Sequence, residues 1–139
     1  MKKSLDSVLK YLESIQYDNA IVADLISDLN KISDEIIKCY KNKGEVILFG
    51  NGGSAAQAEH FVAEMMVKIK NKRKPLPTHS LTSNIPLITA IANDYGYEYI
   101  FSRQLDAYNI KNGVVIGIST SGNSENVING VKKANEKKA

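Results

Sequence analysis

The chain has 139 residues, of which 43% are apolar, and this length and composition predict one globular domain with a hydrophobic core. No run approaches the roughly 18 apolar residues of a membrane span, and the first residues hold no apolar segment of signal-peptide length, so we expect a cytoplasmic protein without a membrane partner. The net charge is only +3, and the lysines of residues 132–138 suit a solvated helix end better than a nucleic-acid surface, because no aromatic residues interleave them.

Two amphipathic helices are predicted at the start of the chain, within about residues 4–42. Apolar side chains recur at helical spacing over 5–15 and again over 21–36. Because both helices precede any strand, we expect part of their apolar faces to pack against another subunit, with packing inside the chain as the alternative. The single Cys39 excludes an internal disulfide and is interpreted as a small buried side chain. Gly44 is expected to take the left-handed turn that ends the second helix.

A strand, a glycine loop and a helix start are predicted at 46–54, where the sequence reads Val-Ile-Leu-Phe-Gly-Asn-Gly-Gly-Ser. A strand that breaks into glycines before a helix leaves free N–H groups at a helix N-terminus, which favours an anion of phosphate size. The same residues match the loose dinucleotide fingerprint G-x-G-x-x-A. A dinucleotide site needs an acidic residue at the end of the next strand, where 80–83 offers none, so no nucleotide cofactor is expected.

The helix predicted from about Ser54 carries His60 and Glu64, which are four residues apart. Four residues is about one helical turn, so the imidazole and the carboxylate project from one face and can reach the same metal ion or substrate. The carboxylate suits a general base on a carbon-bound proton. The alternative is an ordinary exposed pair, and the sequence offers no convincing further metal ligands. The helix is expected to run into the basic stretch that ends at Pro75 and Pro77.

The remaining elements are predicted in the order of a parallel α/β sheet. They are a short strand at 78–82, a helix over about 85–96, a helix over 97–108, a strand at 114–118 and a last helix that begins after Ser124. The strand at 114–118 is continuously apolar, which predicts cover on both of its faces. His79 in the short strand is interpreted as packed or hydrogen-bonded. The predicted fold of about 45–139 is therefore an open parallel sheet with flanking helices, whose loops gather at the carboxyl edge.

Four hydroxyl side chains follow the last predicted strand, in the loop that carries Ser119, Thr120, Ser121 and Ser124. Hydroxyls and backbone N–H groups at a helix start can hold a phosphate without a cation. The alternative is an ordinary polar loop with a helix cap. This loop is expected to face the glycine loop of Asn51, which favours the phosphate site.

Four motifs together resemble the sugar isomerase (SIS) domain family. They are Phe49–Ser54, His60–Glu64, Ala92–Gly96 and Gly117–Ser124, in this order. The similarity is close to the phosphoheptose isomerases of that family and runs from the first helices to the last residue. It implies a single SIS domain over 1–139 with a flavodoxin-like three-layer sandwich. It also implies an aldose/ketose isomerase that converts sedoheptulose 7-phosphate to D-glycero-D-manno-heptose 7-phosphate by enediol proton transfer.

The same resemblance implies roles for residues and partners. Glu64 would be the base and, with His60, a ligand of one zinc ion per subunit. The substrate contacts that it implies are Asn51, Gly52, Gly53, Ser54, Glu64, Lys68, Asn93 and Asp94, with Ser119, Thr120, Ser121 and Ser124 on the phosphate. A homotetramer with sites shared between subunits, and the supply of heptose for lipopolysaccharide, capsule or other glycoconjugates, are implied as well.

Departures from the family pattern bear on this function. Lys68 stands where relatives usually carry Arg, which keeps the charge but loses the bidentate fork, and Gln57 stands where they often carry Asp. His79 stands where the second strand is normally apolar. Relatives continue through further strands and a last helix, which bring a Gln and a His to the metal, the His also as catalytic acid. We therefore expect the natural chain to continue past Ala139.

Two alternatives to a heptose phosphate isomerase stay open. One is a non-catalytic SIS module that binds a protein partner, as relatives that engage the replication initiator do, or that senses a phosphosugar. The other is an isomerase of another phosphosugar, which Lys68 leaves possible. Glu64 favours an enzyme, because a pure binding module has no need of a base at that position.

Overall fold

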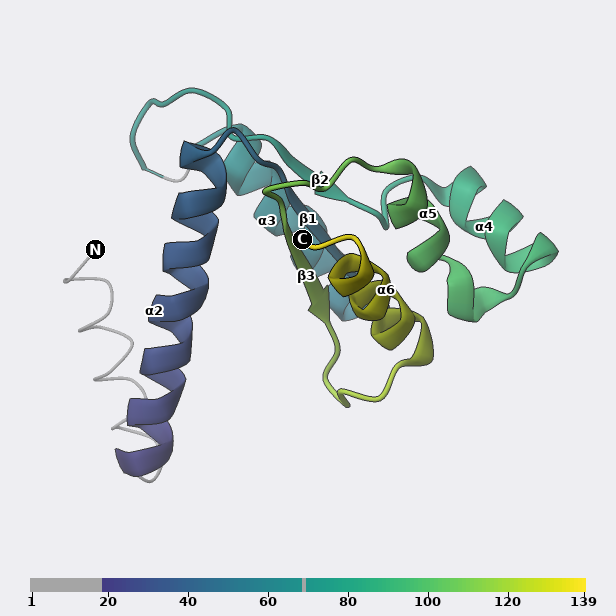
Figure 1. The fold of residues 1–139 in the computed structure, drawn as a ribbon, viewed down its shortest axis with the longest axis horizontal. Helices are drawn as coiled ribbons and strands as arrows, with labels where there is room; N and C mark the ends of the chain where they lie inside the picture. Colours follow the sequence, from purple (N-terminus) through teal and green to yellow (C-terminus); the bar gives the residue numbers. More distant parts are fainter. Residues whose placement is uncertain (1–18, 69) are drawn as a thin grey trace. The chain divides into compact units, whose positions relative to one another are not determined.

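The computed structural model describes residues 19–68 and 70–139 (Figure 1). The chain divides into two compact units, Met1–Ile37 and Lys38–Ala139, and each is described by itself. The first predicted helix, at 5–15, lies outside the described residues. The second is confirmed as α2 (Asn19–Lys41). Among the described helices, none is long and apolar enough to cross a membrane.

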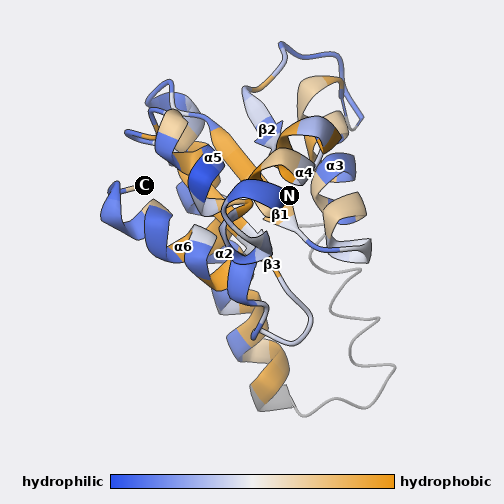
Figure 2. Ribbon diagram, turned by 90° about the vertical axis from the view of Figure 1, so that its right-hand side faces the viewer, coloured by the Kyte–Doolittle hydropathy of each residue, from blue (hydrophilic) through white to orange (hydrophobic). Residues whose placement is uncertain are grey.

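The part of α2 in the first unit carries a stripe of exposed apolar side chains. Ile21, Leu25, Leu29 and Ile32 recur at helical spacing and are between 40% and 59% exposed. Figure 2 shows hydrophobic residues in the first turns of this helix. A helix of this kind is typical of one that buries its apolar face against a partner.

The end of α2 is a Schellman turn in which Lys43, and not Gly44, is left-handed. The N–H of Gly44 donates to the carbonyl oxygen of Cys39 (2.9 Å), and the N–H of Lys43 donates to that of Tyr40 (3.1 Å). This pattern places the left-handed residue at Lys43, whose φ is 58°. The prediction for Gly44 is therefore wrong, and a glycine stands there because a Cβ would overlap the carbonyl oxygen of Asn112. Cys39 is buried, as predicted.

Three parallel strands form the sheet of the second unit, in the order β2-β1-β3. They are β1 (Val46–Gly50), β2 (Thr78–Ser80) and β3 (Val114–Ile118). The helices are α3 (Gly53–Met66), α4 (Ile85–Asp94), the short 3-10 helix η1 (Tyr97–Tyr99), α5 (Ser102–Ala107) and α6 (Glu125–Glu136). Figure 1 shows α3 on one side of the strands and α6 on the other. The predicted open parallel sheet with flanking helices is confirmed.

The core lies between the sheet and the helices α4, α5 and α6. Ile47 and Phe49 alternate along β1 and join Ile91 and Phe101 in one apolar cluster. The rings of Phe49 and Phe101 stack with their centroids 4.7 Å apart. Gly130 of α6 lies directly over Phe49, where a Cβ would come within 2.7 Å of the ring. This close approach fixes α6 against β1, and with it the loop that precedes α6.

Two predicted helices differ from the structure in their extent. The helix expected over 97–108 is instead η1 followed by α5. The N–H of Ile100 donates to the carbonyl oxygen of Tyr97 (3.3 Å), three residues back, and four-residue bonding begins only where the N–H of Leu105 donates to that of Phe101 (3.0 Å). The helix that carries Glu64 ends at Met66 and does not reach the basic stretch. The chain turns back there, and the N–H of Leu76 donates to the carbonyl oxygen of Met65 (3.1 Å).

Strand β3 is half-buried along its whole length, which contradicts the predicted cover on both faces. The prediction of a strand at these residues is confirmed, but the strand lies at an edge of this sheet. It pairs with β1 from Val114 to Ile118, and within residues 19–68 and 70–139 no strand pairs with its other side. Figure 2 shows the hydrophobic colour along the strands of the sheet.

Candidate functional site

Two glycines shape the loop after β1. A Cβ at Gly50 would lie 2.7 Å from the Cβ of Ser54 and 2.8 Å from the carbonyl oxygen of Ile118, so glycine here lets the end of β3 and the start of α3 approach β1 closely. Gly52 has φ 52° and ψ −120°, a conformation that only glycine adopts without strain. The loops that follow β1 and β3 consequently meet at the carboxyl edge of the sheet, as the sequence predicts.

The hydroxyl groups of the loop after β3 form a cluster. The Oγ of Ser119 lies 3.1 Å from that of Ser124 and 3.3 Å from that of Ser121. Ser124 is the N-cap of α6, yet its hydroxyl makes no cap hydrogen bond and lies in the cluster. In the first turn, the N–H of Val127 donates to the side chain of Asn126 (2.9 Å). The cluster brings three predicted phosphate residues together. Thr120 is exposed and makes none of these contacts.

Asn51 joins the glycine loop to the start of α6 and to η1. Its side chain and that of Asn126 exchange two hydrogen bonds of 2.9 Å, and Tyr97 donates a third to the Oδ1 of Asn51 (3.0 Å). A cavity of about 400 Å³ is lined by Asn51, Tyr97, Glu98, Ser124, Glu125 and Asn126. The sequence predicted Asn51 and Ser124 but not Asn126 or Tyr97. No local pattern reveals these contacts, since they join residues 46 to 75 positions apart.

His60 and Glu64 lie on one face of α3, as predicted. The Nε2 of His60 is 3.9 Å from the Oε1 of Glu64, and the two side chains are 78% and 38% exposed. They line a second cavity of about 480 Å³, together with Ala56, Gln57, Phe61 and Met65. The half-buried carboxylate of Glu64 lines this cavity beside the polar side chains of Gln57 and His60, and the remaining lining residues are apolar. Glu64 is thus placed to act on a ligand seated against α3.

Other predicted substrate contacts are not brought to these two cavities. Lys68 is exposed beyond the end of α3, so it does not continue the helical face of Glu64. Asn93 donates to the Oδ1 of Asp94 (2.9 Å), and both are exposed at the end of α4. Gly53 is exposed at the first position of α3, whereas Ser54 is buried behind it.

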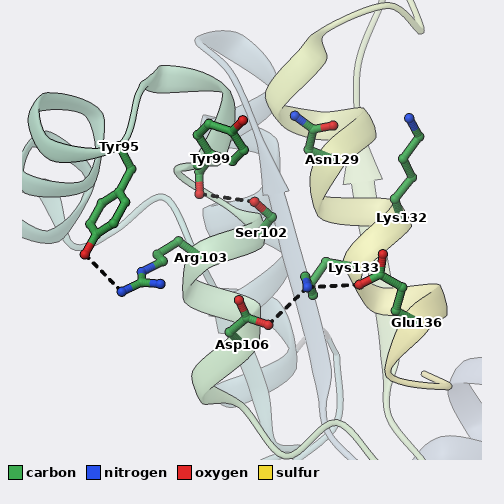
Figure 3. Close-up of a pocket in the computed structure, with 9 residues that line it drawn as sticks. All are labelled: Tyr95, Tyr99, Ser102, Arg103, Asp106, Asn129, Lys132, Lys133 and Glu136. Carbon is green, nitrogen blue, oxygen red and sulfur yellow. Dashed lines mark hydrogen bonds and ion pairs between the residues drawn. The ribbon is translucent and has the colours of Figure 1, made fainter.

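A third cavity, of about 370 Å³, lies between α6 and the segment of η1 and α5 (Figure 3). Its central charges are paired, because Lys133 lies 3.3 Å from Asp106 and 2.9 Å from Glu136. Hydrogen bonds to Glu136 and Asp106 raise the pKa of Lys133. The guanidinium of Arg103 stacks 4.3 Å over the ring of Tyr95.

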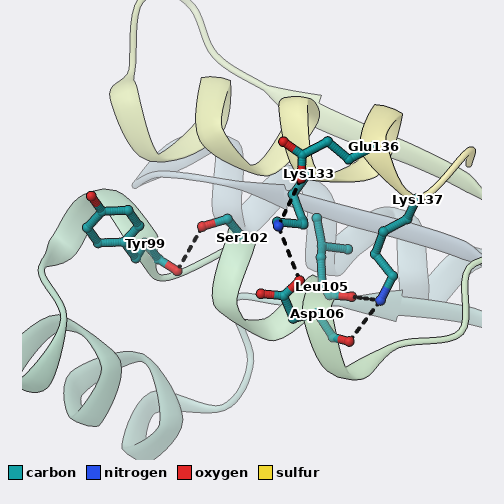
Figure 4. A network of polar contacts seen from close by, with 7 residues as sticks. All are labelled: Tyr99, Ser102, Leu105, Asp106, Lys133, Glu136 and Lys137. Atoms are coloured by element: carbon teal, nitrogen blue, oxygen red, sulfur yellow. Dashed lines mark hydrogen bonds and ion pairs between the residues drawn. The ribbon is translucent and has the colours of Figure 1, made fainter.

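The same charges bind α5 to α6 (Figure 4). Besides the pairs of Lys133, the Nζ of Lys137 donates to the carbonyl oxygens of Leu105 (2.9 Å) and Asp106 (2.8 Å) at the end of α5. A lysine there complements the negative end of the helix. Asp106, Lys133 and Glu136 around the third cavity thus serve as a link between two helices.

His79 lies away from the candidate site. Its Nε2 is 3.2 Å from the Oε2 of Glu45, the residue before β1, and its ring is 5.9 Å from that of Tyr108. Glu45 precedes the first strand, so this contact is near the amino ends of the strands. His79 is thus paired with Glu45 and packed near Tyr108, in agreement with its interpretation as packed or hydrogen-bonded.

Comparison with known proteins identifies the family. The family model of the SIS domain matches residues 10–139, so the chain belongs to the SIS domain family. Phosphoheptose isomerases are among its relatives there. The protein of that name from Aquifex aeolicus is 44% identical over 133 residues, which cover 95% of this chain and 70% of the relative. The one from Helicobacter pylori is 50% identical over 101 residues, which cover 73% of this chain and 53% of the relative.

A solved structure shows the same fold. The phosphoheptose isomerase from Neisseria gonorrhoeae has a TM-score of 0.78 and 38% sequence identity, and the match covers 95% of this chain and 68% of that protein. The predicted family and fold are thus confirmed. The chain spans between about half and 70% of the length of these relatives.

Proposed function

We propose that this protein is a phosphoheptose isomerase, a cytoplasmic aldose/ketose isomerase of sedoheptulose 7-phosphate. The observation that carries the proposal is the position of Glu64, a half-buried carboxylate that lines a cavity beside His60 in a chain of the SIS family. A carboxylate at the wall of a cavity suits proton transfer at carbon. The names of the relatives support a heptose phosphate as the substrate.

In the proposed reaction Glu64 takes a proton from C1 of the ketose. The electron pair of the broken C–H bond forms the C1=C2 double bond, and the carbonyl oxygen at C2 gains a proton, which gives an enediol. Glu64 then returns its proton to C2 while the hydroxyl at C1 loses its proton and becomes the aldehyde. One carboxylate thus serves both carbons, and no atom is gained or lost overall.

The serine cluster is the proposed phosphate site. The hydroxyls of Ser121 and Ser124 each lie within hydrogen-bond distance of the hydroxyl of Ser119, at the N-terminus of α6, a helix of twelve residues. Ser124 does not cap this helix with its hydroxyl, and the N-terminal end of the helix dipole favours a dianion. Thr120, Asn93, Asp94 and Lys68 remain proposed substrate contacts on the basis of the family resemblance.

The proposed zinc ion fits the ligands of α3 in kind but not in number. Imidazole nitrogen and carboxylate oxygen are ligands that zinc prefers, and catalytic zinc has three protein ligands. His60 and Glu64 supply two, and among residues 19–68 and 70–139 no cluster of three potential ligands occurs. A zinc ion held here needs a further ligand from elsewhere in the protein or from another subunit. When bound, it would polarise the carbonyl of the substrate, and the proton transfers above do not depend on it.

The proposed homotetramer is supported by α2. A stripe of four exposed apolar side chains, Ile21, Leu25, Leu29 and Ile32, is costly in water and is typical of a surface between subunits. Their spacing places them on one side of the helix, which suits helix-to-helix packing between copies.

Sites shared between subunits are supported by the separation of the two cavities. Glu64 stands eleven residues after Gly53, which is roughly 16 Å along the axis of α3 at 1.5 Å per residue. The extended seven-carbon chain with its phosphate spans about 10 Å, at roughly 1.2 Å per bond. The cavity of Glu64 and the cavity of Ser124 have no lining residue in common. A substrate on the serine cluster of one copy therefore suits the Glu64 of a second copy better than its own.

The proposed activity is tested by proton NMR of sedoheptulose 7-phosphate with the purified, metal-replete protein in D2O. We expect an aldoheptose phosphate to appear, with deuterium at C2 that reports exchange of the proton on Glu64 with solvent. Glu64→Gln keeps the shape of the side chain but removes the base, so conversion is expected to fall by at least about a hundredfold.

The matched control is Glu59→Gln on the same helix. Glu59 is exposed and accepts a hydrogen bond from Thr82 (3.2 Å), and it does not line the cavity of Glu64. Its replacement is expected to leave the rate within about twofold. No conversion by the folded wild-type protein would refute the sedoheptulose assignment, and equal losses in the two variants would refute the role of Glu64.

A further inference from the structure

Asn126 is a buried side chain at the start of α6, with 3% of its surface exposed. Its Oδ1 accepts a hydrogen bond from the backbone N–H of Val127 (2.9 Å). A backbone N–H can only donate, so the atom that it meets must be the oxygen of the amide. This contact fixes which end of the Asn126 amide is oxygen and which is nitrogen.

The fixed amide of Asn126 in turn fixes the amide of Asn51. The Oδ1 of Asn126 accepts from the Nδ2 of Asn51, and the Nδ2 of Asn126 donates to the Oδ1 of Asn51, each at 2.9 Å. If the amide of Asn51 were turned by 180°, two donors and two acceptors would face each other. The orientation of Asn51 is therefore set by a residue 75 positions away.

Tyr97 completes the hydrogen bonding of one end of Asn51. Its hydroxyl donates to the Oδ1 of Asn51 at 3.0 Å, so this oxygen, which has two lone pairs, accepts two hydrogen bonds. One hydrogen of the Nδ2 is used by Asn126. The second hydrogen of the Nδ2 is therefore the donor of Asn51 that is available to a ligand in the cavity of about 400 Å³ that this residue lines.

We propose that Asn126 and Tyr97 are positioning residues that make Asn51 a hydrogen-bond donor to the substrate. The remaining N–H of Asn51 then selects an acceptor oxygen of the phosphosugar, a carbonyl or a charged oxygen, and rejects a group that can only donate. This inference rests on the proposed function, because it assigns a substrate contact to Asn51. Asn51 lies in the glycine loop, Tyr97 in η1 and Asn126 in α6. The orientation of the glycine-loop side chain thus depends on η1 and α6.

A double-mutant cycle tests whether Asn126 acts through Asn51. We expect Asn126→Ala to lower kcat/KM for sedoheptulose 7-phosphate about tenfold when Asn51 is present, and by less than about twofold in an Asn51→Ala protein. Tyr97→Phe is expected to lower kcat/KM about threefold when Asn51 is present, and to leave it unchanged in the Asn51→Ala protein. A merely structural role for Asn126 would lower activity equally in both backgrounds, and that result would overturn the proposal.

Matched controls separate this effect from a general change of α6 or η1. Asn135 is exposed on the same helix, and Tyr95 is an exposed tyrosine of the same segment whose hydroxyl accepts from Arg103. Asn135→Ala and Tyr95→Phe are expected to leave kcat/KM within about twofold. Losses as large as those of Asn126→Ala and Tyr97→Phe would count against a specific role.

An NMR measurement on the free protein keeps this test independent of the proposed activity. In 15N spectra of the wild type, the two side-chain N–H signals of Asn51 are expected to be well separated, because one is hydrogen-bonded to Asn126. Asn126→Ala should narrow that separation, and unchanged signals would overturn the locking of Asn51. A locked Asn51 in a protein that does not convert sedoheptulose 7-phosphate would refute the proposed function instead.

Discussion

The guanidinium group of Arg73 donates a hydrogen bond of 2.8 Å to the carbonyl oxygen of Glu64. A second nitrogen of the same group donates to the carbonyl oxygen of Met65 (2.6 Å). The last carbonyl groups of a helix have no partner within it, and a cation there also complements the helix dipole. Arg73 therefore caps the helix that carries the proposed base, from a loop that lies outside that helix.

Replacing Arg73 with Ala is expected to destabilise the protein by about 1–2 kcal/mol, since hydrogen bonds to charged groups contribute about 1.5–3 kcal/mol and this side chain is only partly buried. The free energy of unfolding in urea measures the loss. The matched control is Arg103→Ala, which removes an exposed arginine that stacks on Tyr95 and is expected to cost under about 1 kcal/mol. Equal losses in the two variants would contradict the capping role.

Ser124 and Asn84 are both N-cap residues, but they differ in what their side chains do. The Oδ1 of Asn84 accepts from the N–H of Leu87 (3.1 Å) at the start of α4, whereas the hydroxyl of Ser124 makes no such bond and lies by Ser119. We expect Asn84→Ala to cost about 1 kcal/mol of stability, the usual loss for a cap, and Ser124→Ala to cost under about 0.5 kcal/mol. Urea unfolding of both variants measures this difference.

For KM we expect the opposite order, with the larger effect from Ser124→Ala and the smaller one from Asn84→Ala. Ser124→Ala removes a proposed phosphate ligand and should raise KM for the phosphosugar about tenfold, which corresponds to one lost hydrogen bond to a charged group. Asn84→Ala should leave KM within about twofold at a temperature where both variants are folded. A normal KM for the Ser124→Ala protein would contradict the proposal that the serine cluster binds the phosphate.

Alkaline pH is expected to weaken the fold through Cys39 and Tyr40. Burial raises the pKa of the Cys39 thiol and that of the Tyr40 hydroxyl, which hydrogen-bonds Thr78 (2.7 Å). As the pH rises, the unfolded chain releases these protons before the folded one does. Their contribution to stability is thus complete below the ordinary pKa values, about 8.5 and about 10, and is lost as the pH rises through the raised ones.

Urea unfolding at a series of pH values from 7 to about 11 measures this effect. The free energy of unfolding of the wild type is expected to fall more steeply above about pH 8.5 than that of a Cys39→Ala, Tyr40→Phe double variant, because the variant lacks both groups. Other titrating residues are the same in both proteins, so they cancel in the comparison. Parallel curves would show that these two groups do not titrate with folding.

Local patterns predicted much of the fold. The run from Val46 to Ser54 combines a β-branched strand with glycines and a helix start, and the structure confirms all three. His60 and Glu64 were predicted on one helical face from their spacing alone, because helical geometry depends on sequence separation. The hydroxyls of Ser119 and Ser124 meet for a similar reason, since they belong to one tight loop.

Contacts between distant segments account for what the sequence did not predict. The early end of α3 depends on Arg73 and Leu76, which are held against Met65 only after the chain has turned. The orientation of Asn51 depends on Asn126, and no spacing rule connects positions 75 residues apart. Gly44 was assigned the wrong role because the atom it must avoid belongs to Asn112, in another loop.

The free edge of β3 has a consequence for handling the protein. Within residues 19–68 and 70–139, no strand pairs with the side of β3 (Val114–Ile118) that faces away from β1, so backbone N–H and C=O groups on that side have no strand partner there. Edges of this kind, rich in β-branched residues and free of proline, are templates for added strands from other chains. Where no further part of the protein covers this edge, we expect concentrated samples to aggregate through this segment, and a short peptide of matching sequence to block that aggregation.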